Sequence, residues 1–311
     1  MFFSFKCGSN IAIAALCQIT MEDQAQVQTQ TYWFDQPEAE EVGNVSEVNL
    51  RITTYNIHKG VSSFGHRPRI HALKQAITGM ESDILFLQEV QGRNDLQAMR
   101  HAANWPELSQ QDFLAGDSHE CAYGMNAVYD HGHHGNALLS RFPIVSTRNQ
   151  DVSDHAFEAR GILHCRVRTP LTDVHCYVIH LGLFAGSRKR QTEALIEAVQ
   201  SSAPAGEPII IAGDFNDWSN NLSDTLRSTL KVNEVFDQRL SRRSFGTYFR
   251  QLQGRGPKVQ PARTFPAALP VLALDRIYVR GFQVENAKVM HGALWAKLSD
   301  HAPIVADLKL K

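Results

Sequence analysis

The chain has 311 residues, 43% hydrophobic and 20% charged, which is an ordinary composition for a globular protein with a sizeable core. Its formal net charge of −1 excludes a global positive field that recruits nucleic acid, although a local basic groove stays compatible with it. The five cysteines contain no C-x-x-C pair, so neither a disulfide framework nor a zinc knuckle is suggested.

Residues 1–47 are predicted to be a leader that precedes the folded domain. Residues 11–17 form an apolar stretch that is far too short to span a bilayer. Residues 1–20 resemble a weak signal peptide, but Met21 offers an alternative start, so export and a start at Met21 both stay open. Residues 22–47 are polar and acidic without periodicity, which is typical of a disordered segment.

The folded part begins with short apolar runs that alternate with turn signals. Residues 50–56 alternate like a half-buried strand, and residues 83–89 predict a buried strand. Between them, residues 68–80 predict a helix, because Pro68 suits a first helical turn and the apolar residues that follow share one face. A second, shorter helix is predicted for residues 93–104.

The rest of the chain continues this alternation. Residues 105–136 are predicted to be rich in loops. Helices are predicted for residues 187–200, capped by Ser187, and for residues 219–230. Strands are predicted for residues 137–140, 143–149, 159–168, 174–181, 208–214, 272–279, 283–291 and 302–310. No repeat or proline-rich linker divides the region, so residues 48–311 are predicted to form one α/β domain with mixed sheets and outer helices.

Two cysteines fall within the predicted strands. Cys165 and Cys176 are expected to be small buried thiols. Buried free thiols favour a reducing compartment, so a cytoplasmic location is expected.

Polar side chains stand at the end of nearly every predicted core strand. Folds of this class place their sites at one edge of the sheet system, so these side chains are expected to meet there. Because burying an unpaired carboxylate is costly, a cation or a hydrogen-bond donor is expected beside them. The residues are Asn56, Glu89, His180, Asp214, Asn216, Asp275, Asp300 and His301.

The predicted chemistry is metal-assisted attack on phosphorus. Mg²⁺ prefers oxygen ligands and keeps several waters, so one or two carboxylates suffice to hold it. Glu89 is the best ligand, with Asn56 and Asp300 beside it. Asp214 is expected to orient or deprotonate the attacking water, and Asn216 to donate a hydrogen bond to the transition state.

Two histidines are expected to take part in proton transfer. His301 and Asp275 resemble a carboxylate–imidazole pair, in which the acid fixes the tautomer of the ring. His180 is a second candidate for an acid or a phosphate donor.

The motifs YNIH, LQEV, HGNALLSRFPI, ARG, VIHL, GDFND, LDRIYV and LSDHAPI occur in this order. Together they resemble the endonuclease/exonuclease/phosphatase superfamily, the deoxyribonuclease I-like proteins, over about residues 48–311. The resemblance implies a four-layer α/β/β/α sandwich of two packed mixed sheets, Mg²⁺ or Mn²⁺ as cofactor, and hydrolysis of phosphoester bonds. It places His180 on the second histidine of the deoxyribonuclease branch and Arg160 on its phosphate-contacting arginine. The family's core positions fall on Asn56, Glu89, Asp214, Asn216, Asp275, Asp300 and His301.

Departures from the family pattern bear on the substrate. Abasic endonucleases carry an acidic or amide residue two places after the first asparagine, where this chain has His58. The tryptophan-rich stretch of the exonuclease III type is also missing. The motif NIHKG most resembles a group of poorly characterised bacterial members, so the resemblance indicates the reaction class better than the substrate.

Several residues have a simpler alternative role. Asp217 and Asp307 are predicted to be a turn residue and a solvated strand residue. The histidines of residues 131–135 are expected on a loop beside the site, with transition-metal binding as the alternative. The flanking residues Asn126 and Asn136 are candidates for substrate contacts.

The stretch 239–263 holds seven basic residues and no acid, with aromatic residues among them. It is compatible with phosphate contacts and stacking, or with a solvated loop. The leading prediction is a monomeric, metal-dependent phosphodiesterase that acts on nucleic acid. The alternatives are a lipid or inositol phosphoesterase and a non-catalytic binding protein.

Overall fold

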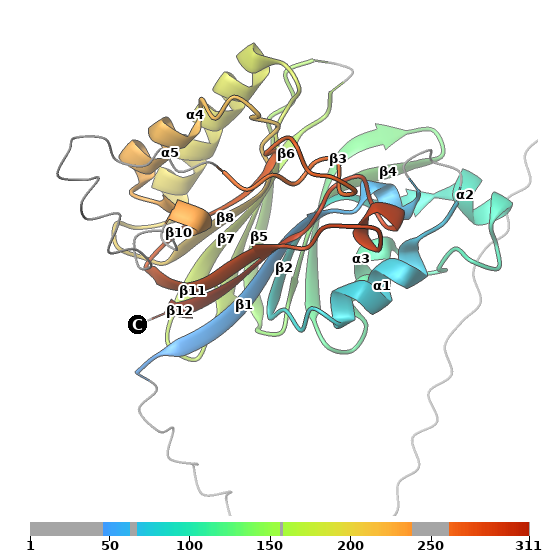
Figure 1. Ribbon diagram of the computed structural model, residues 1–311, viewed down its shortest axis with the longest axis horizontal. Coiled ribbons are helices and arrows are strands. Elements are labelled where there is room, and N and C mark those ends of the chain that lie inside the picture. Colours follow the sequence, from blue (N-terminus) through green and yellow to red (C-terminus); the bar gives the residue numbers. More distant parts are fainter. Residues whose placement is uncertain (1–45, 63–66, 156–157, 238–260, 311) are drawn as a thin grey trace, which may run out of the picture. The chain divides into compact units, whose positions relative to one another are not determined.

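The computed structural model describes residues 46–62, 67–155, 158–237 and 261–310 (Figure 1). The chain divides into two compact units, residues 1–43 and 44–311, and all described residues belong to the second. The predicted leader and the predicted basic stretch therefore lie almost wholly outside the described residues. None of the described helices is long and apolar enough to cross a membrane.

The first of two six-stranded sheets has the strand order β11-β12-β1-β2-β4-β3. Within it, β1 and β2 are parallel neighbours and the other pairs are antiparallel. Its strands are β1 (Val48–Asn56), β2 (Ile84–Asn94), β3 (Glu120–Tyr129), β4 (Gly132–Ser140), β11 (Phe282–Val289) and β12 (Ile304–Leu310).

The second sheet has the order β5-β6-β7-β8-β10-β9, and its single parallel pair is β7 with β8. Each sheet therefore contains one parallel pair near its centre, and the carboxyl ends of each pair lie side by side. The strands are β5 (Ile144–Asp151), β6 (Gly161–Arg168), β7 (Asp173–His180), β8 (Ile209–Asp214), β9 (Asn233–Glu234) and β10 (Asp275–Arg280).

The helices lie on the outer faces of the two sheets (Figure 1). Beside the first sheet are α1 (Ile70–Thr78), α2 (Asp95–Arg100) and α3 (Gln110–Ala115). Beside the second sheet are α4 (Ala185–Ser202) and α5 (Ser223–Leu230). Two short 3-10 helices, η1 (His58–Gly60) and η2 (Trp295–Lys297), complete the elements used below. The predicted four-layer α/β/β/α sandwich is confirmed.

Successive side chains of the central strands pack on opposite faces of their sheets, and this explains the layers. In β2, Phe86 packs into the core between the sheets, whereas Leu85 and Leu87 pack under α1. In β8, Ile210 faces the same inner core, whereas Ile211 packs under α4 and α5. Successive strand residues point to opposite faces, so a strand that is covered on both faces reads as a continuous apolar run. Burying each such side chain contributes roughly 1.5–3 kcal/mol.

The prediction that residues 105–136 are mainly loop is wrong. They contain α3, all of β3 and the start of β4. His133 and His134 therefore lie in a strand, paired with β3 on one side and β2 on the other. Glycine and histidine hide the alternation of a strand, and the pairing partners that stabilise this segment are distant in the sequence.

Three predicted helices begin or end elsewhere. Strand β2 continues to Asn94, so the helix predicted for residues 93–104 shrinks to α2. Helix α4 begins before Ser187, whose hydroxyl donates to Asp154 at 2.6 Å instead of capping the helix. Helix α5 begins at Ser223, because the Asp217 carboxylate closes a turn by accepting from Leu222 N at 2.9 Å. The prediction that Asp217 is a turn residue is confirmed.

The structure also shows the surroundings of the two strand cysteines, of Asp307 and of Asn136. Cys165 and Cys176 are free and buried, as expected. Asp307 is half-buried and accepts from Arg51 Nε at 2.8 Å, so it belongs to an ion pair rather than to a purely solvated face. Asn136 of β4 donates to the carbonyls of Gly161 at 2.9 Å and Val178 at 3.3 Å, so its amide joins the two sheets.

We predict that Gly213→Ala destabilises the fold by several kcal/mol. Gly213 has φ +154°, and a Cβ built there lies 1.9 Å from the carbonyl oxygen of Ile179 on the parallel neighbour. The backbone of β7 or β8 must then shift, immediately before Asp214. Urea unfolding measures the effect, with Gly186→Ala in α4 as the control, because a Cβ there meets only the far end of Arg190 at 3.6 Å. Equal stability of both variants contradicts the prediction.

Candidate active site

The sheet topology gathers the predicted residues at one edge. In the first sheet, Asn56 at the end of β1 lies beside Gln88, next to Glu89. In the second sheet, His180 at the end of β7 pairs with Asp214 at the end of β8. Because β10 runs antiparallel to β8, its first residue, Asp275, also pairs with Asp214.

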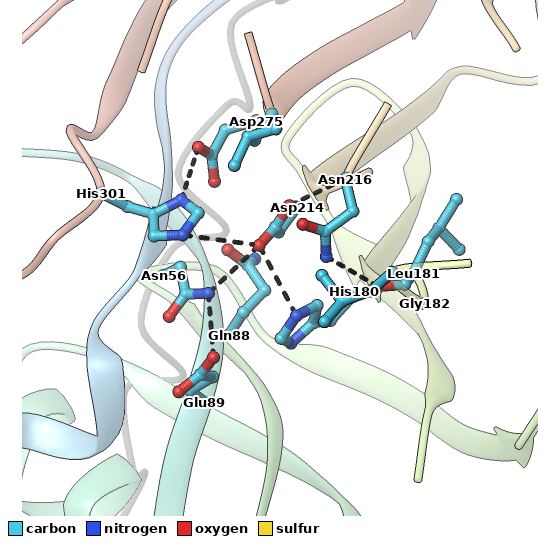
Figure 2. A network of polar contacts seen from close by, with 12 residues as sticks. Asn56, Gln88, Glu89, His180, Leu181, Gly182, Asp214, Asn216, Asp275 and His301 are labelled. Atoms are coloured by element: carbon cyan, nitrogen blue, oxygen red, sulfur yellow. Dashed lines mark hydrogen bonds and ion pairs between the residues drawn. The ribbon is translucent and has the colours of Figure 1, made fainter. Parts of the chain in front are cut away.

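Asp214 is the centre of the resulting polar network (Figure 2). Its carboxylate is buried, and Oδ2 accepts from Asn56 Nδ2 at 3.3 Å. The same oxygen lies 3.5 Å from His180 Nε2 and 3.7 Å from His301 Nε2. Burial raises the pKa of Asp214 to about 6, against the opposing charge of His301. Asp214 is therefore mostly ionised at neutral pH but can accept a proton readily.

His301 lies between two carboxylates. Its Nδ1 is 2.8 Å from Asp275 Oδ2, which also accepts from the hydroxyl of Thr264 at 2.6 Å. Burial alone would lower the pKa of His301, but the charges of Asp275 and Asp214 raise it to about 10. The ring is therefore charged at neutral pH, with both N–H groups directed at acids.

His180 and Asn216 complete the second-sheet side of the network. Burial, followed by the charge of Arg160, holds the pKa of His180 well below its usual range, so this ring is neutral. Asn216 adopts φ +50°, donates its backbone N–H to Asp214 Oδ1 at 2.9 Å and its amide to the carbonyl of Leu181 at 2.9 Å. Asn216 therefore ties the loop after β8 to the loop after β7.

The three predicted metal ligands lie on the first-sheet side. Glu89 Oε1 accepts from Asn56 Nδ2 at 3.3 Å, and Oε2 lies 3.8 Å from Lys59 Nζ. Asp300 lies 3.2 Å from His58 Nδ1; burial would raise the pKa of Asp300, but this hydrogen bond and nearby charges lower it. Each carboxylate thus faces a basic side chain, Lys59 for Glu89 and His58 for Asp300.

Two donor sets can be compared as a site for a divalent metal. Asp214, Asp275 and His301 each offer a ligand atom within 4.8 Å of the others. However, both ring nitrogens of His301 already face carboxylates, and Mg²⁺ prefers oxygen. Glu89 and Asn56 are in contact and offer only oxygen ligands, and their strands lie at the same edge. The residues present therefore fit a hard divalent cation, best at Glu89.

Arg160 has structural partners where a phosphate contact was predicted. Its guanidinium donates to the carbonyls of Leu181 at 3.2 Å and Ala159 at 3.1 Å, and lies 3.6 Å from Glu158. Its charge helps to keep the nearby His180 neutral. The sequence motif did not reveal this role.

Two residues at the site were not predicted, and a third, His134, was expected beside the site but on a loop rather than in a strand. His58 and Lys59 of NIHKG adopt φ +47° and +58°, which is uncommon for residues with a side chain and turns both toward the predicted ligands. His134 of β4 has a buried Nδ1 without a partner among the described residues, and burial lowers its pKa to about 4. The charges of Lys59, Glu89 and Arg160 act on this ring, so it lies beside the site. The glycine of NIHKG was the only available signal for the turn.

Comparisons with known proteins agree with this architecture. The model of the Endonuclease/Exonuclease/phosphatase family matches residues 53–301. The uncharacterized protein YbhP of Escherichia coli K12 is 39% identical over 267 residues, which are 85% of this chain and 98% of that protein.

Solved structures show the same fold at low identity. The mannosyl-6-phosphatase Bt3783 of Bacteroides thetaiotaomicron VPI-5482 has a TM-score of 0.58 and 17% identity, covering 83% of this chain and 99% of that one. The 2',3'-cyclic phosphatase ANGEL2, in complex with adenosine-2',3'-vanadate, has a TM-score of 0.59 and 14% identity, covering 86% and 97%. That this chain belongs to a group of bacterial family members with the motif NIHKG stays a prediction.

We predict that Asp275→Asn lowers the pKa of His301 from about 10 toward its ordinary value. The carboxylate charge that raises this pKa to about 10 is lost, while burial, which lowers it, remains. In the parent, the raised pKa contributes stability that is fully present below about pH 6.5 and lost as the pH rises toward 10. NMR titration of the ring in metal-free protein measures the pKa, and thermal unfolding measures the stability. The exposed Asp224→Asn is the control; titration of the parent ring near 6.5 contradicts the prediction.

Proposed function

The chain belongs to the endonuclease/exonuclease/phosphatase family, and from this premise we propose that it is a divalent-metal-dependent phosphodiesterase. The observation that carries the proposal is the buried row of side chains Asp275, His301 and Asp214, in which the imidazole lies between the two carboxylates. It places a charged imidazole beside a carboxylate whose pKa lies near 6. A base and an acid are thus available together at neutral pH, as hydrolysis by in-line attack of water requires.

Each residue has a role in this proposal. Asp214 orients the attacking water and accepts its proton. His301, oriented by Asp275, donates a proton to the leaving oxygen. Asn216 and His180 hydrogen-bond the phosphoryl oxygens as charge develops on them. Acid–base groups of this kind each contribute roughly 10²–10⁴-fold to the rate.

Mg²⁺ or Mn²⁺ is the proposed cofactor. Glu89, Asn56 and Asp300 would hold the ion, which supplies positive charge to the phosphoryl oxygens and lowers the pKa of a bound water. The cationic Lys59 and the imidazole of His58 beside Glu89 and Asp300 support this assignment, because these two carboxylates attract positive charge.

Two classes of substrate are considered for the proposed phosphodiesterase. Nucleic acid, the prediction from the sequence, is supported by the fold of ANGEL2, whose ligand is a nucleotide analogue. The alternatives from the sequence are a phospholipid head group, which contains the same phosphodiester bond, and an inositol phosphate, which is a phosphomonoester. Nicking of supercoiled plasmid that needs metal and disappears in Asp214→Ala would assign DNA. The free buried thiols support a cytoplasmic location.

We predict that the full chain hydrolyses bis(p-nitrophenyl) phosphate with Mg²⁺ or Mn²⁺ and not with EDTA. Asp214→Asn should lower kcat by about 10²–10⁴-fold, because the proton acceptor is lost. Release of p-nitrophenolate measures the rate, and Asp224→Asn on α5 is the matched control. A parental rate in Asp214→Asn would sink the assignment of the base.

We predict that Glu89→Gln weakens Mn²⁺ binding by about tenfold or more, since an anionic oxygen ligand is replaced by a neutral one. Isothermal titration calorimetry of Mn²⁺ into metal-free protein measures the affinity independently of activity. The control is Glu193→Gln on the exposed side of α4. Unchanged affinity in Glu89→Gln would move the metal site elsewhere.

A further inference from the structure

Large apolar side chains are exposed on three loops that carry site residues. One loop follows β7, one follows β8, and the third precedes β10. The exposed fraction reaches 64% for Phe184 and 75% for Leu269. We call these side chains the apolar rim: Leu183, Phe184, Trp218, Leu269, Val271 and Leu272.

All three loops touch the catalytic network. The loop after β7 provides the Leu181 carbonyl that binds Asn216, and Trp218 follows two residues after Asn216. In the third loop, Ala267 N donates to the carbonyl of Asp300 at 2.7 Å. The Phe265 ring lies 5.1 Å from that of His301. Each of the three loops that carry the apolar rim is therefore joined to the polar network.

The first two loops are held in place by a buried arginine. Arg188 Nη1 donates to the carbonyl of Leu183 at 2.5 Å, and its guanidinium lies 4.8 Å from the centre of the Trp218 ring. Arg188 thereby fixes Leu183 and Trp218 together while its own charge stays buried.

The third loop is closed by backbone hydrogen bonds. Val271 N and Leu272 N both donate to the carbonyl of Phe265 at 2.8 Å. The exposure of the apolar rim therefore belongs to ordered loops. Half of the twelve large apolar side chains that are exposed in the described part of the chain lie on this rim. Such a concentration marks an interaction surface.

The composition of the loops indicates the partner. Residues 181–187, 215–222 and 264–274 contain no lysine or arginine, and their one acid, Asp217, is buried in its turn. Three exposed basic residues stand directly outside these ranges: Lys189, Arg190 and Arg263. Nucleic acid, a polyanion, is bound chiefly through cations. Four of the six rim side chains are aliphatic and offer no flat face for stacking on a base. A group of exposed apolar side chains beside a phosphodiester site, with the basic residues Lys189, Arg190 and Arg263 next to it, fits a molecule whose phosphodiester lies next to long hydrocarbon chains.

We propose that the apolar rim docks the active site on a phospholipid surface, where a lipid head-group phosphodiester is the bond hydrolysed. The proposal rests on the proposed function for its chemistry. The water oxygen bonds to phosphorus, and one P–O bond to an alcohol breaks. Water gives a proton to Asp214, and the leaving oxygen takes one from His301. Leu183 and Leu269 insert among the lipids, with Trp218 and Phe184 at the level of the head groups.

The first test is sedimentation with sucrose-loaded vesicles of phosphatidylcholine, or of phosphatidylcholine with phosphatidylglycerol, in EDTA so that no hydrolysis occurs. Phe184→Asp and Leu269→Asp should each lower the partition coefficient about tenfold. The reason is that each variant loses the favourable free energy of burying one large apolar side chain in the membrane. The loss should be the same for both compositions, since the rim is uncharged. Met99→Asp on α2, which is 81% exposed, is the matched control. All variants are made in the full chain, so any contribution of other residues to vesicle binding is the same in each of them.

A second measurement uses phosphatidylcholine brominated in its acyl chains. Tryptophan fluorescence should be quenched on binding, and Trp218→Phe should remove this quenching. Phe184→Asp should keep the parental rate on bis(p-nitrophenyl) phosphate but lose release of choline or phosphocholine from vesicles. This split would show a docking defect with an intact reaction centre.

Three results would overturn the proposal. The first is parental vesicle binding in both rim variants, and the second is an equal loss in Met99→Asp. The third is binding of single-stranded DNA that falls in the rim variants while vesicle binding stays the same. Failure of the parent on bis(p-nitrophenyl) phosphate refutes the proposed function instead, because vesicle binding in EDTA is measured without any reaction.

Discussion

The buried carboxylate of Asp214 is the constraint on which the rest of the site depends. A carboxylate without partners in this position would cost several kcal/mol. Its partners come from both sheets: Asn56 from β1, His180 from β7 and His301 from the turn before β12. The two sheets must therefore pack in one register before the charge of Asp214 is compensated. The geometry of the site and the packing of the core are consequently established together.

Backbone strain is concentrated at this edge. Seven described residues other than glycine have positive φ, and four of them belong to the site. They are His58, Lys59, Glu89 and Asn216. Such conformations cost of order 1–3 kcal/mol each and persist only where the surrounding structure imposes them. Here the polar contacts and the buried strands hold these residues in place, so the donors and the acids are arranged before any substrate arrives.

The site combines a charged centre with an uncharged border. The polar network around Asp214 and the proposed metal ligands supply the charges, whereas the side chains of the apolar rim carry none. Two solved structures with this fold are named as phosphatases of different substrates, a mannosyl-6-phosphatase and a 2',3'-cyclic phosphatase. The proposed docking on a lipid surface rests on this apolar border.

The sequence by itself determined the layered fold, the family and the group of polar residues at the strand ends. These features are local, because an apolar strand and the polar residues that end it are neighbours in the sequence, as from Ile209 to Asn216. Tertiary structure alone decided that residues 132–135 lie in a paired strand and that Arg160 binds carbonyls. It also decided that Phe184, Trp218 and Leu269 are exposed. Pairing, partner choice and exposure depend on atoms contributed by distant segments, and no local pattern contains that information.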